Sequence, residues 1–298
     1  MKGKNVVVTG GAGFIGSNLV LELERQNYKV TVLDNLFTGT ENNLNGFKGK
    51  FINVDISQPF DIKERFDVIF HQAAITDPRF DNDDVTTKVN IDGFKNIIEL
   101  AKKNNSKLVY ASSASMYGNG PVPMKEDQEK DLLSTYAKSK LMMDDIAKEL
   151  FDEMHIVGLR YFNVFGPREA HKGRPASMIY HLSKQILSGK KPRLFRMGEQ
   201  KRDHIYVKDC VTATLKALEA PSGVYNVGTG VGTSFNDLIK ILNEVWSTDY
   251  YPEYFDNPYE GTYQNNTQAD TYMAEKHLKF KAKWSLKKGI EDYKNGLE

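Results

Sequence analysis

The stretch VVVTGGAGFIG, residues 6–16, decides how the rest of this sequence is expected to fold. Its valines are typical of a buried strand, and the residues after the glycines show the apolar spacing of a helix. A strand, a glycine turn and a helix in this order form a phosphate cradle, because the helix N-terminus presents free backbone N–H groups. Gly10 permits the tight turn, Gly13 the close approach of a pyrophosphate, and Gly16 the packing of helix on strand. The stretch therefore predicts a dinucleotide site.

An acidic residue at the expected place supports this site. Residues 29–33, KVTVL, indicate a second strand, and Asp34 follows it. In dinucleotide-binding folds an acid about 20 residues after the glycines meets the ribose hydroxyls of adenosine. No Lys or Arg occurs in residues 34–46, and Glu41 adds a negative charge. Local charge therefore favours NAD over NADP, whose extra phosphate is anionic.

Strand and helix patterns alternate through the first half of the chain. The apolar patterns predict strands over 67–71, 107–111 and 156–161, and helices over 89–103 and 136–154. Repeated units of this kind predict an α/β fold, a doubly wound parallel sheet of the Rossmann type. Ligands then bind at the carboxyl ends of the strands, which the glycine turn, Asp34, Ala73-Ala74 and Ser112-Ser113 all follow.

The sequence changes character after residue 165, where Gly, Pro and basic residues become frequent. We predict a Rossmann domain of residues 1–165 plus about 203–228. A smaller C-terminal α/β substrate-binding domain is predicted for about 166–202 plus 229–298. The strand and helix within 203–218 and the strand at 224–228 are expected to return to the main sheet. Residues 234–245 have the period of an amphipathic helix, and 250–263 are expected to form a loop.

Length and composition limit the class of protein. The chain has 298 residues, 40% of them hydrophobic, a net charge of +1 and one cysteine, Cys210. These values predict a soluble, cytoplasmic protein with a sizeable core and neither a nucleic acid nor a membrane as partner. The absence of a run of about 18 apolar residues predicts no transmembrane helix. No Gly-x-Ser-x-Gly elbow, His-Glu-x-x-His motif or cysteine cluster occurs, which disfavours a hydrolase and predicts no metal site.

Tyr136 and Lys140 form a candidate catalytic pair. Residues four apart share one helix face, and a nearby ammonium is expected to lower the pKa of the tyrosine. Ser113 ends the strand before them and could hydrogen-bond the same substrate oxygen as Tyr136. Two other Tyr–Lys pairs have this spacing, but only this pair lies in the cofactor half behind a strand that ends in serines. The pattern predicts proton transfer on a substrate hydroxyl.

Together, four motifs resemble those of the extended short-chain dehydrogenase/reductases: the glycine turn, SASMYG at 113–118, the Tyr136/Lys140 pair and RYFN at 160–163. The resemblance covers essentially the whole chain. It implies that the tyrosine moves a proton on a sugar hydroxyl while a bound nicotinamide takes and returns hydride, and that the lysine holds the nicotinamide ribose. Dehydratases of this family carry an Asp-Glu pair where this chain has Ser115-Met116. That difference argues against a dehydratase.

The second half is similar to the ADP-heptose 6-epimerases of this family. The similarity lies in NVFGPREAHKG at 163–173, KRDHIYV at 201–207, GTYQ at 261–264 and TQAD at 267–270. It implies inversion of C6 of an ADP-heptose through a transient 6-keto intermediate, for lipopolysaccharide core or related glycan synthesis, with Lys172 as a second acid/base. A UDP-sugar 4-epimerase of the same fold and a non-catalytic dinucleotide-sensing protein remain alternatives.

The resemblance also implies a homo-oligomer with one tightly bound cofactor per subunit. The family resemblance implies NADP as this cofactor, whereas the local charge around Asp34 favours NAD. Both dinucleotides therefore stay open. The expected catalytic residues are Tyr136, Lys140, Ser113 and Lys172. The cofactor residues are Gly10, Gly13, Phe14, Ile15, Gly16, Asp34, Asn35, Asp55, Ile56, Gln72, Ala73, Ala74, Asn90, Tyr136, Lys140 and Val164. The substrate residues are Ser113, Asn163, Lys172, Arg174, His181, Phe195, Arg202 and Tyr263.

Overall fold

A seven-stranded, wholly parallel sheet forms the centre of the computed structural model, which describes residues 3–77, 82–258 and 263–297. The strand order is β10-β6-β5-β4-β1-β2-β3. Chain order reverses direction between β1 and β4, and such a switch point opens a crevice for a ligand. The strands are β1 (Asn5–Thr9), β2 (Lys29–Asp34), β3 (Lys50–Asn53), β4 (Val68–His71), β5 (Lys107–Ser113), β6 (Ile156–Tyr161) and β10 (Gly223–Val227).

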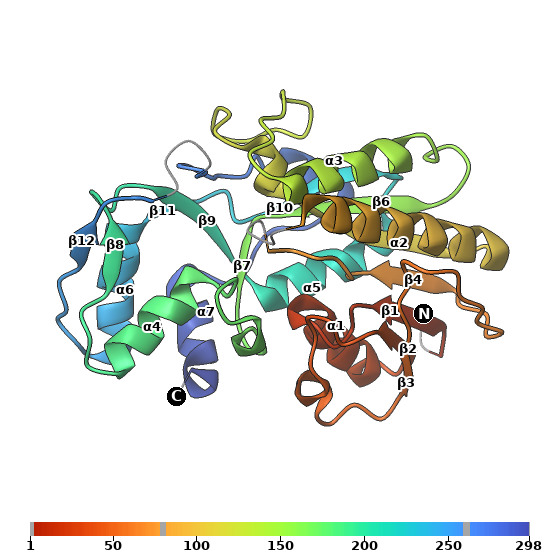
Figure 1. Cartoon of the computed structure of the whole chain (residues 1–298), viewed down its shortest axis with the longest axis horizontal. Helices are drawn as coiled ribbons and strands as arrows, with labels where there is room; N and C mark the ends of the chain where they lie inside the picture. Colours follow the sequence, from red (N-terminus) through yellow and green to blue (C-terminus); the bar gives the residue numbers. More distant parts are fainter. Residues whose placement is uncertain (1–2, 78–81, 259–262, 298) are drawn as a thin grey trace.

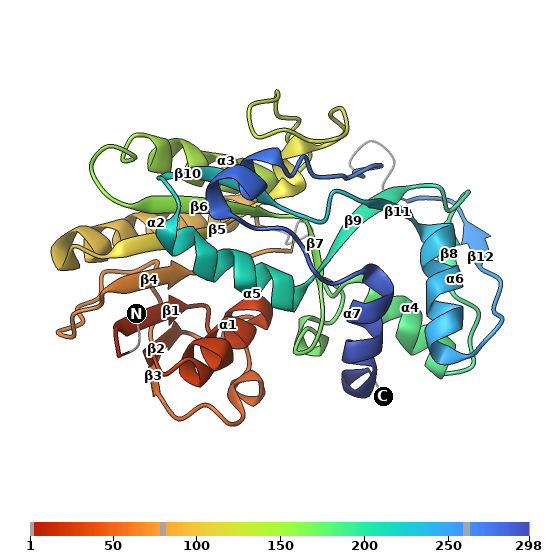
Figure 2. The same cartoon turned by 180° about the vertical axis from the view of Figure 1, so that it is seen from behind.

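Helices cover both faces of this sheet (Figures 1 and 2). α1 (Phe14–Arg25) and α5 (Val207–Lys216) lie on one face, and α2 (Asp83–Asn104) and α3 (Thr135–Lys148) lie on the other. The valines of β1 show why both faces need covering. Val6 and Val8 belong to the core cluster that contains Leu19 of α1, whereas Val7 packs in the cluster of Phe94 from α2. Successive side chains of a strand point to opposite faces, so a continuous valine run is buried on both sides.

A smaller part lies beyond the carboxyl ends of the strands, on the left in Figure 1. It contains a three-stranded sheet of order β11-β9-β7 and a two-stranded sheet of β12 and β8. Its strands are β7 (Asn163–Phe165), β8 (Arg193–Phe195), β9 (Lys201–Tyr206), β11 (Gly232–Ser234) and β12 (Glu253–Phe255). Its helices are α4 (Met178–Leu187), α6 (Phe235–Trp246) and α7 (Leu286–Tyr293), which share an apolar core. The short helices are η1 (Glu41–Leu44), η2 (Ala114–Tyr117), η3 (Ala170–Lys172), η4 (Ala217–Glu219), η5 (Ala274–Leu278) and η6 (Lys294–Gly296).

The predicted fold class is confirmed, with several local differences. The helix predicted over 136–154 ends earlier, since α3 stops at Lys148 and the chain turns over 149–154. The strand predicted from residue 203 does not join the main sheet: β9 pairs with β7 and β11, and only the following helix, α5, returns to pack on α1. The expected loop at 250–263 contains the short strand β12. Gly261 and Thr262, the first two residues of the GTYQ motif at 261–264, lie outside the described residues. β3, β8 and α4 were not predicted. The domain boundaries stay a prediction.

No helix in the described ranges is both long and apolar enough to cross a membrane.

Candidate active site

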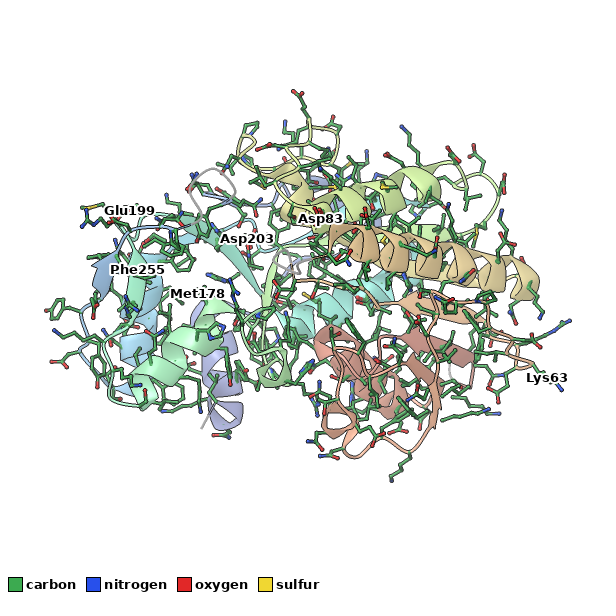
Figure 3. All side chains as sticks on the ribbon, in the orientation of Figure 1. Lys63, Asp83, Met178, Glu199, Asp203 and Phe255 are labelled. Atoms are coloured by element: carbon green, nitrogen blue, oxygen red, sulfur yellow. The ribbon has the colours of Figure 1, made fainter. Side chains whose placement is uncertain are left out.

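A cavity of about 1280 Å³ lies at the carboxyl ends of the parallel strands, between the main sheet and the smaller part. It is lined by the glycine turn, by the ends of β2, β4, β5 and β6, and by residues of the smaller part. Figure 3 labels two lining residues of the smaller part, Met178 and Phe255. Every cofactor, catalytic and substrate residue named from the sequence lines this cavity. The fold thus brings them together, while their individual roles stay predictions.

The glycine turn is shaped to receive a phosphate group. Gly10 has a φ of +66°, and a Cβ there would lie 2.6 Å from the backbone nitrogen of Ala73. A Cβ on Gly16 would lie 2.1 Å from the carbonyl oxygen of Gly10. No side chain among the described residues caps the N-terminus of α1, and the first residues of this helix line the cavity with their N–H groups. These residues fit the pyrophosphate of a dinucleotide.

Asp34 ends β2 at the far end of the cradle. Its Oδ2 accepts a 2.9 Å hydrogen bond from the backbone nitrogen of Ala12, and its Oδ1 accepts one of 2.8 Å from Leu36. Burial raises the pKa of this carboxyl, and the two backbone hydrogen bonds oppose the rise. The carboxylate is thereby fixed where an adenosine ribose would lie.

A basic residue from the smaller part also reaches this end of the cavity. His171 lines it, and its Nδ1 lies 3.0 Å from the side-chain nitrogen of Asn43. The same Asn43 nitrogen donates a 3.0 Å bond to the carbonyl of Ala12. Burial lowers the pKa of His171, which favours the neutral imidazole. His171 therefore adds little positive charge for a 2′-phosphate at neutral pH.

Tyr136 and Lys140 share one face of α3, at the end of β5. Lys140 is 1% exposed, and its Nζ lies 5.8 Å from the centre of the Tyr136 ring. Burial lowers the pKa of Lys140 to about 8, with Asp144 opposing the change. The expected lowering of the Tyr136 pKa is wrong for this structure: burial raises that pKa, and the Ser113 side chain is the group that opposes the rise. Desolvation of the phenol outweighs its proximity to the ammonium.

Lys172 sits in a loop that a buried carboxylate holds in place. Glu169 is fully buried and accepts hydrogen bonds from the backbone nitrogens of Gly166, at 3.1 Å, and Ser177, at 2.6 Å. The Lys172 Nζ lies 5.6 Å from the ring centre of Phe14, beside the glycine turn. Burial lowers the pKa of Lys172, and the nearby charge of Glu169 opposes this. The loop therefore delivers an amine of lowered pKa to the cofactor side of the cavity.

Aromatic side chains gather around Arg202 at the other end of the cavity. The guanidinium centre lies 4.8 Å from the Tyr263 ring and 5.7 Å from the Phe235 ring. The Phe195 ring lies 5.2 Å from that of Tyr263 and 5.0 Å from that of Phe255. A guanidinium among aromatic faces suits a planar base followed by phosphates.

The remaining predicted substrate residues have hydrogen-bond partners within the protein. Asn163 accepts a 2.9 Å hydrogen bond from the hydroxyl of Thr267 through its Oδ1. The Nε2 of His181 lies 3.2 Å from the carbonyl oxygen of Arg174. The first pair joins the lining residue Asn163 to Thr267 behind it, and the second joins two lining residues of the smaller part.

Sequence reasoning missed several lining residues. The two-residue period of a strand could have predicted His204, because it lies two residues after Arg202 and so faces the same side of β9. His171 lies beside Lys172 in a motif that was quoted, but nothing in it indicated contact with the Asp34 end. Phe255 carried no signal, since its position depends on the pairing of β12 with β8.

This chain belongs to the NAD dependent epimerase/dehydratase family, which residues 6–228 match. The glycine cradle, the Tyr136/Lys140 pair and the cavity at the strand ends are the features of this structure that such an enzyme uses. It is an NAD(P)-dependent enzyme of that class.

Particular relatives are similar over nearly the full length. A curated relative from Brachyspira hyodysenteriae, named ADP-L-glycero-D-manno-heptose-6-epimerase, is 37% identical, with 98% of each chain covered. The solved structure of the Helicobacter pylori ADP-L-glycero-D-manno-heptose-6-epimerase is also 37% identical, with 99% of this chain and 96% of that chain covered and a TM-score of 0.93. A UDP-N-acetylglucosamine 4-epimerase from Methanobrevibacter ruminantium, solved with UDP-N-acetylmuramic acid, is 32% identical, with 99% and 98% covered and a TM-score of 0.91.

Proposed function

We propose that this protein inverts the configuration at C6 of an ADP-heptose through a transient 6-keto intermediate. The observation that carries the proposal is the placement of two acid/base groups from different elements in one cavity: Tyr136 from α3 and Lys172 from the loop after β7. The 37% identity to relatives named as ADP-heptose 6-epimerases supports the choice of substrate.

Inversion needs one proton carrier for each of two substrate poses. In one pose a base removes the proton of the C6 hydroxyl, and in the other an acid returns a proton to the C6 oxygen after rotation about C5–C6. A bound NAD(P)⁺ supplies the redox chemistry, taking hydride from C6 and returning it to the opposite face. Tyr136, whose pKa is raised by burial, suits the acid, and Lys172, whose pKa is lowered by burial, suits the base. In the reverse direction the two exchange roles.

The other lining residues hold the substrate and cofactor. In this proposal Ser113 and Lys140, which both line the cavity, hydrogen-bond the reacting oxygen and hold the nicotinamide ribose, respectively. Arg202 meets the diphosphate, and Phe195 and Tyr263 contact the adenine. Asn163, His181 and Arg174 surround the heptose. Asn35, Asp55, Ile56, Gln72, Ala74, Asn90 and Val164 line the dinucleotide portion of the cavity.

We assign the cofactor as NAD rather than NADP. The fixed carboxylate of Asp34 would repel a 2′-phosphate, and His171 is the basic side chain that reaches it from the smaller part. The Arg168 guanidinium is engaged by other groups: its Nε donates to the carbonyl of Asn43 at 3.2 Å, and its Nη1 to the side-chain oxygen of Asn18 at 3.4 Å.

We also propose that this protein forms a homo-oligomer and acts in the cytoplasm. Val85 of α2 and Met142 of α3 are exposed apolar side chains on two helices that pack side by side. Burial of these side chains against a second subunit would remove their apolar surface from water. Light scattering coupled to size-exclusion chromatography tests this, and a monomeric mass contradicts it.

A UDP-sugar 4-epimerase is the second candidate, because the 4-epimerase from M. ruminantium has a TM-score of 0.91 with this chain. The test is to incubate the protein with ADP-D-glycero-D-manno-heptose and to follow the C6 signals by NMR. Our proposal predicts appearance of the L-glycero epimer. Interconversion of UDP-glucose and UDP-galactose, with no change in the heptose, would establish the alternative.

A further inference from the structure

His204 is a buried histidine in the wall of the cavity. It is 5% exposed and lines the cavity from β9. Neither Nδ1 nor Nε2 has a hydrogen-bond partner among the described residues. Buried polar atoms are nearly always satisfied, because leaving one without a partner is costly. Two such atoms on one ring, in the wall of a ligand cavity, indicate a group that the ligand completes.

Strand geometry explains which way the ring faces. Arg202 and His204 both line the cavity, whereas Asp203 between them accepts hydrogen bonds from Thr229 and Gly230 on the other side of the strand. Figure 3 labels Asp203 where the two parts meet. The His204 ring packs edge-on to Phe235, with 6.4 Å between ring centres. The imidazole is therefore held in one orientation toward the cavity.

The order of side chains along this wall matches the order of groups in a nucleotide sugar. Tyr263 and Phe195 form the aromatic end, and Arg202 comes next. His204 follows on the same strand and pairs in register with Asn163 of β7, which lies nearer the reaction centre. A nucleotide sugar presents a base, then a diphosphate, then a sugar. His204 accordingly lies between the positions of the base and the sugar.

We propose that His204 donates a hydrogen bond to the diphosphate of the bound nucleotide sugar and thereby helps select substrates with that linkage. This rests on the proposed function, which supplies the nucleotide sugar. Part of the hydrogen-bonding capacity of the neighbouring Arg202 is used within the protein, since its Nη1 donates to the carbonyls of Lys201 and Asn265, each at 2.9 Å. His204 thus supplies a second donor, in a direction that the guanidinium does not cover.

The protonation state of the ring fits this role. Burial lowers the pKa of His204 to about 3, and the Arg202 charge adds to the effect. A neutral imidazole carries one N–H donor and one acceptor. The donor meets a phosphate oxygen without placing a second full charge in the wall.

The test is isothermal titration of the purified protein, with its resident cofactor, against ADP, UDP and adenosine. His204→Phe keeps the aromatic volume and removes both nitrogens, and His204→Asn restores a donor. We expect His204→Phe to weaken ADP binding by roughly tenfold to a hundredfold, the value of a hydrogen bond to a charged group. Adenosine binding is expected to stay unchanged, and His204→Asn to recover part of the ADP affinity.

A matched control is His155→Phe, which removes a half-buried imidazole outside the cavity lining. It should leave ADP affinity unchanged, and thermal unfolding of each variant reports whether it is folded. Unchanged ADP affinity in His204→Phe overturns the inference. If such a variant binds ADP normally, an added titration with ADP-glucose shows whether the ring contacts the sugar instead. Failure of the unaltered protein to bind either ADP or UDP overturns the proposed function as well, which separates the two failures.

Discussion

Lys140 donates a 2.6 Å hydrogen bond from its Nζ to the backbone carbonyl of Ala111. This bond joins the buried face of α3 to the carboxyl end of β5. The lysine is thus positioned by the sheet itself, and the bond uses one of its three N–H donors. The others remain available toward the cavity that Tyr136 also lines.

Removing the Tyr136 hydroxyl should abolish most turnover. We expect Tyr136→Phe to lower kcat by about 10²–10⁴-fold, the usual contribution of a positioned acid/base, with the cofactor still bound. Steady-state kinetics with the heptose substrate and the absorbance of the retained dinucleotide measure both effects.

The matched control is Tyr272→Phe, in a pair with the same sequence spacing as Tyr136 and Lys140. The Lys276 Nζ lies 5.6 Å from the Tyr272 ring centre, close to the 5.8 Å in the catalytic pair, but Tyr272 is 63% exposed. Full activity is expected. Equal losses in the two variants, or no loss in Tyr136→Phe, would show that Tyr136 carries no proton.

The buried Lys140 should make stability depend on pH in the alkaline range. Its pKa of about 8 lies below the value of about 10.4 in an unfolded chain. Between these values the unfolded chain binds the proton and the folded chain does not, so the free energy of unfolding gains from Lys140 as pH rises. Relative to Lys140→Met, which cannot titrate, the native protein should gain stability from pH 8 to 10 with a slope of at most roughly 1.4 kcal/mol per pH unit. Urea unfolding at several pH values checks this, and a constant difference contradicts it.

The charge of Asp34 should set the cofactor preference. Asp34→Asn keeps a similar shape and removes the negative charge, so NADP affinity relative to NAD should rise by about tenfold or more. Glu41→Gln is the control: it removes an exposed charge from η1, the short helix that follows β2, and screening by solvent makes its effect smaller. Titration with both dinucleotides measures the ratio. The mass of the dinucleotide released on denaturing the native protein should be that of NAD, and finding NADP would refute the assignment.

The Glu169 carboxylate should stabilise the loop that carries Lys172. Glu169→Gln retains one acceptor oxygen where the carboxylate used two, so an amide NH₂ would face a backbone N–H. We expect a loss of about 1–3 kcal/mol in the free energy of unfolding together with reduced turnover. The exposed Glu199, labelled in Figure 3, provides the control, and Glu199→Gln should change stability by less than roughly 0.5 kcal/mol. Similar losses in the two variants would mean that Glu169 has no special role.

Local features of the sequence were sufficient to predict the cofactor half. The glycine turn and the valines of β1 carry their structural meaning within a dozen residues, and Tyr136 and Lys140 lie within one turn of a helix. Such patterns are set by backbone geometry, which is why the sheet, its class and the gathering of these residues could be predicted.

Features that depend on distant partners could not be predicted. β12 is three residues long, and it forms because β8 lies beside it. The raised pKa of Tyr136 follows from how deeply the fold buries the phenol, which the spacing to Lys140 does not reveal. The role proposed for His204 could not be predicted either, because only the fold shows that its ring nitrogens lack hydrogen-bond partners among the described residues.

The most direct test of the central claim uses ADP-D-glycero-D-manno-heptose carrying deuterium at C6, with NMR detection of the product. Hydride that leaves C6 and returns to it within one enzyme carries the label with it, so the account predicts L-glycero product with deuterium retained at C6. Loss of the label to solvent would contradict hydride return, and failure to invert C6 at all would contradict the assigned substrate.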